Sequence, residues 1–170
     1  MEISAAAPED VHGIATVHIR SWQAAYAEIL DPAWLSTLSI EARAKRWQDI
    51  IVTNESHTVV SRSVGRITGF ASFGKCRDEG ATSSQGEIWA LYAAPEVWRQ
   101  GTGRALLEHA ASRLSASGCD TISLWVLTGN HRGILFYESC GFERVQGSEK
   151  LFELGGRQVE EVAYLLRNDA

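Results

Sequence analysis

The chain has 170 residues, of which 45% are hydrophobic and 22% charged, the ordinary composition of a globular protein. At this length we expect a single domain, residues 1–170, that is large enough to bury a sizeable core. The formal net charge of −5 argues against sequence-independent nucleic-acid binding, which requires a basic surface. An acidic excess is compatible with a cationic substrate but is too common to indicate one.

The three cysteines, Cys76, Cys119 and Cys140, are odd in number and lack CxxC spacing, so neither a disulfide framework nor a zinc site is indicated. The five histidines are scattered without metal-ligand spacing, and we assign no metal. The N-terminal stretch lacks the basic and long apolar segments of a signal peptide, and no apolar run is long enough to span a bilayer. We therefore expect a cytoplasmic protein without a membrane partner.

The first half of the chain predicts a strand, two helices and two more strands. Apolar residues recur at spacings of three and four between Val11 and Tyr26, which is typical of one helical face, and Asp31-Pro32 ends that helix. Ser39 is placed to cap the second helix. The expected elements are a strand at 2–7, helices at 8–26 and 40–51, and strands at 57–62 and 67–76.

The second half alternates strands with helices before two closing strands. Gly118 and Gly141 are placed to end the two helices, and Asn130 is placed to cap the second of them. The expected elements are strands at 87–93, 121–126, 149–154 and 159–166, with helices at 101–117 and 131–140. This order predicts an α/β domain with a mixed sheet that is antiparallel in its middle.

Residues 86–107, GEIWALYAAPEVWRQGTGRALL, combine an apolar strand, a turn containing Pro95, and two glycines that lead into a helix. A helix start leaves N–H groups without partners and carries the positive end of the helix dipole, so it favours an anion. Gly101 and Gly103 would let a phosphate approach the backbone closely. The glycine pair alone is equally compatible with an ordinary turn before an ordinary helix.

Two common nucleotide-binding motifs do not match this junction. No Gly-Lys-Ser/Thr follows the glycines, as a P-loop requires, and Leu106 stands where the third glycine of a Rossmann fingerprint belongs. The antiparallel strands expected before it are also the wrong context for a Rossmann unit.

Three motifs, in the expected order, resemble the GNAT superfamily of N-acetyltransferases. The first is the Gln/Arg-x-x-Gly-x-Gly/Ala loop for the pyrophosphate of acetyl-CoA, here WRQGTG at 98–103. The second is an apolar strand running into proline, here IWALYAAP at 88–95. The third is a strand, an Asn and a helix ending in Tyr and Gly-Phe, here LWVLTGNHRGILFYESCGF at 124–142. Trp98 departs from the usual Gln or Arg, although Arg99 keeps a cation beside it.

The resemblance covers nearly the whole chain and implies both a fold and a reaction. It implies a GNAT-like mixed, largely antiparallel six- to seven-stranded sheet with helices on both faces and a splay between the fourth and fifth strands. It implies transfer of the acetyl group of acetyl-CoA to a primary amine of a small molecule or protein, by direct attack in a ternary complex. A homodimer through the C-terminal strands is common in this family, and no nucleic-acid partner is expected.

The resemblance also assigns the cofactor-binding residues. The backbone of the strand pairs with the pantetheine arm, and an N–H near Leu91 or Tyr92 polarises the thioester carbonyl. The loop and helix start hold the pyrophosphate, for which successive amides, a hydroxyl and arginine charges are physically suited. Asn130 caps its helix and holds the amide arm. The full set is Leu91, Tyr92, Ala93, Arg99, Gln100, Gly101, Thr102, Gly103, Arg104, Asn130 and Tyr137.

Two residues are the catalytic candidates. Tyr137, seven residues past Asn130, matches the family's general acid, because a phenol with a pKa of about 10 can return a proton to a departing thiolate. The alternative is a core aromatic residue beside Phe136. Glu87 lies eleven residues before Trp98, the spacing at which histone-acetylating members carry their base. It is equally compatible with a solvated carboxylate, in which case ordered water activates the amine.

The acceptor site is expected between the N-terminal helices and the last hairpin. Trp22 and Tyr26 are the candidate substrate residues, in a region that also contains Trp34 and Trp47. Their rings would hold an amine by cation–π contact. At helical spacing, such residues more often belong to the core.

Two functions remain open from the sequence. The first is an active N-acetyltransferase, and the second is a regulatory module that binds acetyl-CoA without catalysis. Tyr137 and Asn130 favour the enzyme, because a binding module has no need of a phenol at that spacing.

Overall fold

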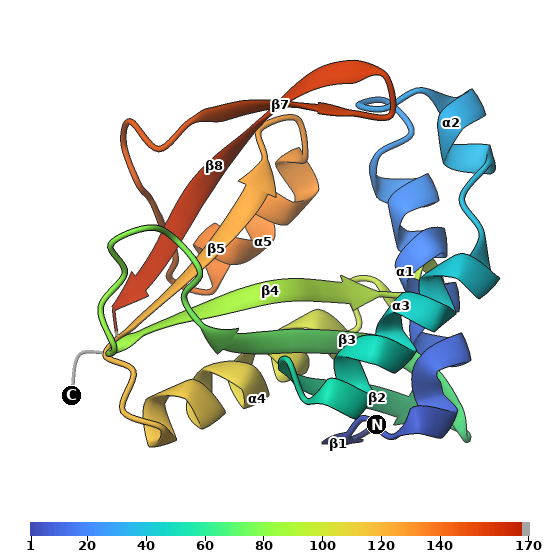
Figure 1. Ribbon diagram of the computed structural model, residues 1–170, viewed down its shortest axis with the longest axis horizontal. Coiled ribbons are helices and arrows are strands. Elements are labelled where there is room, and N and C mark those ends of the chain that lie inside the picture. The colour runs from blue at the N-terminus through green and yellow to red at the C-terminus, as the bar shows by residue number, and fades with distance from the viewer. Residues whose placement is uncertain (168–170) are drawn as a thin grey trace.

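The computed structural model describes residues 1–167, and the last three residues of the expected domain lie outside that range. The described strands form one mixed sheet in the order β1-β2-β3-β4-β5-β8-β6, with β7 paired to β8 (Figure 1). Their bounds are β1 Glu2–Ala5, β2 His57–Ser63, β3 Arg66–Lys75, β4 Gln85–Ala93, β5 Thr121–Leu127, β6 Glu143–Arg144, β7 Lys150–Leu154 and β8 Arg157–Arg167.

Helices cover both faces of this sheet (Figure 1). On one face, α1 and α3 pack over β2, β3 and β4, with Phe70 and Trp47 buried between them. On the other face, α4 and α5 enclose the largest core cluster. The helices are α1 Val11–Ala25, α2 Pro32–Ser36, α3 Ile40–Thr53, α4 Thr102–Ala116 and α5 His131–Ser139, with 3-10 turns at Pro8–Asp10 and Pro95–Val97.

The expected fold class is confirmed, with two additions to the expected elements. The described sheet has eight strands rather than six or seven, because the two-residue strand β6 pairs with β8. The Asp31-Pro32 pair ends the first helical region and also starts α2, since the Asp31 side chain accepts a hydrogen bond from the Ala33 amide at 2.8 Å. Both elements are too short to show a hydrophobic period.

The sheet opens between β4 and β5. These parallel strands pair over three residues, from Gln85↔Thr121 to Glu87↔Ser123, and the described pairing ends there. Two residues later β4 carries a bulge against β3: Ser72 pairs with Ala90, whereas Phe73 pairs with Ile88. A bulge bends its strand and increases the local twist. The bulge therefore carries the second half of β4 away from β5, and the expected splay is confirmed.

Candidate active site

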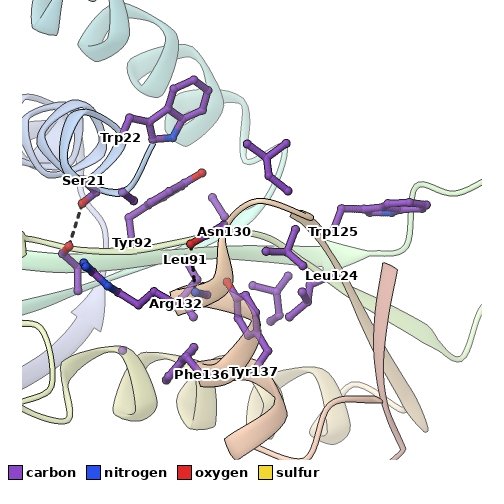
Figure 2. Close-up of a pocket in the computed structure, with 18 of the residues that line it drawn as sticks. Ser21, Trp22, Leu91, Tyr92, Leu124, Trp125, Asn130, Arg132, Phe136 and Tyr137 are labelled. Atoms are coloured by element: carbon purple, nitrogen blue, oxygen red, sulfur yellow. Dashed lines mark hydrogen bonds between the residues drawn. The ribbon is translucent and has the colours of Figure 1, made fainter. Parts of the chain in front are cut away.

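The open end of the splay contains a cavity of about 800 Å³. Its walls come from α1, β4, the loop before α4, β5, α5 and the β7–β8 hairpin. Trp22 and Tyr92 lie at one end of the close-up view, and Phe136 and Tyr137 lie at the other (Figure 2). Segments from most of the length of the chain therefore meet here.

At one end of the cavity, α4 begins with unpaired amides. Its N-cap is Gly101, in the left-handed conformation with φ of 86°, and no side chain of residues 1–167 caps the helix. A Cβ at Gly103 would lie 3.5 Å from the Phe136 ring, so the chain itself tolerates a side chain there, yet the position lines the cavity. Amides without a cap next to open space form an anion site.

The loop before α4 contains a residue with a strained backbone, and a side-chain hydrogen bond holds the loop in place. Arg99 adopts a left-handed φ of 62°, which is unfavourable for a residue with a side chain. Trp98 stabilises the loop, because its indole nitrogen donates to the Ala93 carbonyl at 2.7 Å. The residue that departs from the family motif therefore fastens the loop to the end of β4.

A cation that the motif comparison did not identify also lies at this loop. The Arg132 guanidinium stacks over the Trp98 ring, with its Cζ 4.1 Å from the ring centroid, and Arg132 lines the cavity. It follows Asn130 by two residues, so a basic residue in the first turn of α5 was the signal that could have suggested it. Arg132 thus adds positive charge to the anion site at the start of α4.

The other predicted loop residues fall into two groups. Arg99, Gly101, Gly103 and Arg104 line the cavity. The Gln100 side chain instead donates to the Glu96 carbonyl at 2.8 Å, and Thr102 is buried with 5% of its surface exposed. The Gln100 amide also donates to the Val97 carbonyl, at 3.3 Å, so of these two positions only the Thr102 backbone amide remains a predicted cofactor contact.

The end of β4 forms the floor of the cavity. Leu91, Tyr92 and Ala93 all line it, as predicted residues of the pantetheine strand. The Ala93 carbonyl accepts hydrogen bonds from the Ser21 hydroxyl, at 2.8 Å, and from Trp98. This double anchor fixes the strand end between α1 and the loop. In the described part of the chain, the edge that faces β5 has no partner strand beyond Glu87.

Asn130 and Tyr137 meet at the cavity on α5. The Asn130 side chain accepts from the Gly133 amide at 3.1 Å, which confirms the predicted cap. The Tyr137 ring rises from α5 into the cavity (Figure 2) and packs edge-on against Phe136 and Phe142. Burial is the main cause that raises the pKa of Tyr137 far above its usual range, so the phenol stays protonated at neutral pH.

Glu87 lines the cavity with 3% of its surface exposed. Arg77, from the loop between β3 and β4, donates to it three times: from its backbone amide at 2.9 Å, from Nε at 3.2 Å and from a terminal nitrogen at 2.5 Å. A carboxylate offers about four lone-pair sites, so one stays available for a proton. The candidate base is thus a buried, oriented carboxylate and not a solvated one.

The aromatic residues of α1 and α3 divide between site and core. Trp22 and Tyr26 line the cavity, whereas Trp47 is buried in the core under α1. Trp34 packs against Trp22, with ring centroids 6.4 Å apart. The structure therefore brings both of the predicted substrate residues to the cavity and leaves Trp47 as a core residue.

The sequence of the chain was compared with known proteins. The model of the acetyltransferase (GNAT) family matches residues 19–142. The chain belongs to this family. It is 36% identical over 154 residues to an uncharacterized N-acetyltransferase, YuaI, of Bacillus subtilis, covering 91% of this chain and 86% of that protein. The expected class of enzyme, an acyltransferase, is thereby confirmed.

One further relative and one solved structure cover different extents of the chain. The [Ribosomal protein bS18]-alanine N-acetyltransferase of Escherichia coli is 36% identical over 78 residues, 46% of this chain and 49% of that protein. The structure of yncA from Salmonella typhimurium, a putative acetyltransferase by its description, superposes with a TM-score of 0.76 at 22% identity and covers 100% of this chain and 95% of that one. At this identity, the structural likeness bears on the fold alone.

Residues 1–167 of this GNAT chain show neither a candidate membrane-spanning helix nor a candidate metal-binding cluster. No helix there has both the length and the apolar character needed to cross a membrane. Within the same range, no group of three or more His, Cys, Asp or Glu side chains is arranged to hold a metal ion.

One buried histidine supports the cavity wall from behind. The His18 ring stacks on Tyr92, with centroids 4.6 Å apart, and its Nδ1 accepts from the Trp47 indole at 3.2 Å. Burial first, and then the charges of Arg43 and Arg46, lower the pKa of His18 to about 3. The imidazole is therefore neutral in the folded protein, and its role is to pack against the strand that carries Tyr92.

This histidine makes stability depend on pH. In the unfolded chain it gains a proton below a pKa of about 6.5, whereas the folded chain does not, so stability is lost as the pH falls. We expect wild type to lose about 1 kcal/mol more than His18→Gln between pH 7.0 and 5.5, measured by urea unfolding. Equal slopes for wild type and His18→Gln would contradict this assignment.

Proposed function

We propose that this chain, as a single domain, transfers the acetyl group of acetyl-CoA to a primary amine. The observation that carries the proposal is that two features border the same cavity. One is the edge of β4 beyond Glu87, which has no partner strand on the side of β5 within residues 1–167, and the other is the start of α4, which β4 reaches through the turn at Pro95–Val97 and the loop after it. An extended thioester arm fits the first feature by strand-like pairing, and a pyrophosphate fits the second. The relative yncA is described with its cofactor acetyl-CoA, and this supports the same donor here.

The residues of the donor half have complementary tasks. The amides at the start of α4 bind phosphate oxygens, and the Arg99, Arg104 and Arg132 side chains supply positive charge around them. Asn130 fixes the start of α5, which supports the proposal that it also holds the amide arm of the cofactor. An amide near Leu91 or Tyr92 donates to the thioester carbonyl and so stabilises the charge that develops on its oxygen.

The chemical step requires a base and an acid. Glu87 takes a proton from the acceptor ammonium, directly or through ordered water, because one of its lone-pair sites remains free. The neutral amine nitrogen then bonds to the thioester carbonyl carbon, the carbon–sulfur bond breaks, and the nitrogen releases its second proton to water. Tyr137 gives its proton to the departing thiolate, which leaves as a neutral thiol. The products are an amide and free CoA.

Direct transfer is favoured over a covalent enzyme intermediate. Among the described residues that line the cavity there is no cysteine. Cys119 is buried in the core behind the sheet, and the Cys76 thiol lies 3.6 Å from the Ser123 hydroxyl, outside the cavity lining. A ternary complex of donor and acceptor therefore accounts for the site with the residues present.

The proposal is tested by thiol release with a panel of amines: polyamines, amino acids, aminoglycosides, and peptides with free N-termini or lysines. One relative is a ribosomal-protein-alanine N-acetyltransferase by name, so peptide N-termini beginning with alanine belong in the panel. Acetyl-CoA should also raise the melting temperature. Binding without thiol release for any amine would favour the regulatory module instead.

A pair of variants checks where the donor binds. A Cβ at Gly103 would lie an ordinary 3.5 Å from the Phe136 ring, and the family motif accepts alanine at this position. Gly103→Ala should therefore leave folding and the Kd for acetyl-CoA nearly unchanged. Gly103→Asp places a carboxylate beside the amides that we assign to the pyrophosphate, and we expect it to raise this Kd about tenfold or more by charge repulsion. An unchanged Kd for Gly103→Asp by calorimetry would contradict the assignment.

A further inference from the structure

A half-buried carboxylate without a partner lies in the cavity wall. Glu161, on β8, faces Leu127 of β5 on one side and Lys150 of β7 on the other in the strand register. It lines the cavity. Within the described chain, its carboxylate accepts no hydrogen bond and forms no ion pair, which is unusual because a partly desolvated charge normally has a partner.

The charged groups around Glu161 are paired with one another. The Lys150 ammonium, directly across the ladder, lies 3.4 Å from the Asp78 carboxylate and 3.6 Å from the centroid of the Trp125 ring. Arg77 is paired with Glu87. Each of these pairs is neutral, so Glu161 leaves one uncompensated negative charge in this part of the cavity.

The pKa of Glu161 reflects this unfavourable environment for its charge. Burial is the main cause that raises the pKa of Glu161, and the nearby Asp78 and Glu87 carboxylates raise it further, whereas Lys150 acts in the opposite direction. A partly buried carboxylate without a partner is stabilised in its ionised form when a cation approaches. The other groups in this part of the wall are apolar or aromatic: Trp22, Tyr26, Phe152 and Leu154.

We propose that Glu161 binds the ammonium group of the acceptor, and that the acceptor is an amine on an apolar or aromatic body. The inference rests on the proposed acetyl transfer and concerns its acceptor half. The charge accounts for the release of the product as well as for the binding of the substrate, because the substrate amine is cationic in water whereas the amide product is neutral. Glu161 then favours the substrate over the product at the same site.

Binding measurements on the complex with CoA separate this role from a structural one, because no reaction occurs without an acetyl group. The probes are 2-phenylethylamine and its acetylated product, N-(2-phenylethyl)acetamide, titrated by calorimetry. We expect Glu161→Gln to raise the Kd of the amine about tenfold or more, the loss of a hydrogen bond to a charged group. The Kd of the neutral product should change by less than about twofold. Glu161→Asp, which keeps the charge, should retain part of the amine affinity.

The control is Glu153→Gln, which removes the same charge from an exposed position of the same hairpin and should change neither Kd. An unchanged amine Kd in Glu161→Gln would overturn the inference, as would equal weakening of amine and product, which indicates altered shape. It would also fail if wild type saturated with CoA bound neither 2-phenylethylamine nor any other apolar amine. Absence of CoA binding to wild type would instead count against the proposed function.

Discussion

Tyr137→Phe should lower kcat by about a hundredfold while leaving the Kd for acetyl-CoA unchanged, because a general acid contributes about 10²–10⁴ to the rate. The substitution removes one oxygen from a ring that packs between Phe136 and Phe142, so the wall of the cavity keeps its shape. Since burial raises the pKa of Tyr137, the phenol remains protonated through neutral pH, and wild type should show no alkaline loss from this group below about pH 10. Free thiol release in single turnovers measures the effect.

The matched control is Tyr164→Phe. Tyr164 is a buried tyrosine of β8 whose hydroxyl donates to Glu138 at 3.1 Å, and it does not line the cavity. The Tyr164→Phe variant likewise loses a phenol oxygen, and we expect it to keep the wild-type kcat. If both variants lost the same activity, or if Tyr137→Phe raised the Kd for acetyl-CoA as much as it lowered kcat, the role of general acid would be wrong.

Glu87→Gln should lower kcat by about 10², since an amide cannot accept the proton of the acceptor ammonium. The variant also disrupts a buried ion pair. Arg77 is half exposed, so screening by solvent reduces what the pair contributes, and we expect a loss of about 1–2 kcal/mol of stability. Assays below the melting transition therefore separate chemistry from folding.

Asp10→Asn is the matched control for this loss. Asp10 is likewise buried and held by two hydrogen bonds from an arginine, Arg62, but it lies at the start of α1, outside the cavity lining. It should reduce stability and leave kcat unchanged. A loss of less than about threefold for Glu87→Gln would assign the proton to ordered water instead.

Features that depend on neighbours in the sequence could be predicted from it. Ser39 and Asn130 were identified as helix caps, and both accept the expected backbone amide, because a cap bonds within its own first turn. Tyr137 could be placed in the same way, since Asn130 and Tyr137 belong to one helix with a fixed geometry. Gly101 and Gly103 could be assigned to an anion site because the start of a helix exposes its amides whatever surrounds it.

Other features depend on distant segments and were not predictable. The sequence showed Trp98 as a departure from the family motif, but could not show that Arg132 stacks on it from another helix. It suggested Glu87 as a base without indicating that Arg77 holds it. His18, separated from Tyr92 by the length of two helices and two strands, gave no sign of its packing role.

The sequence by itself therefore determined the class of fold, the residues of the proposed donor site and the candidate acid, since periodicity, caps and motif spacing are local and fix the geometry of single elements. Tertiary structure alone decided the bulge that bends β4 away from β5, the pairing of Glu87 and the isolation of Glu161. Each of these depends on which residues meet across the sheet, and hence on strand register and on charges distant in the sequence. The proposed donor site is thus encoded locally, whereas the proposed acceptor site is assembled by the fold.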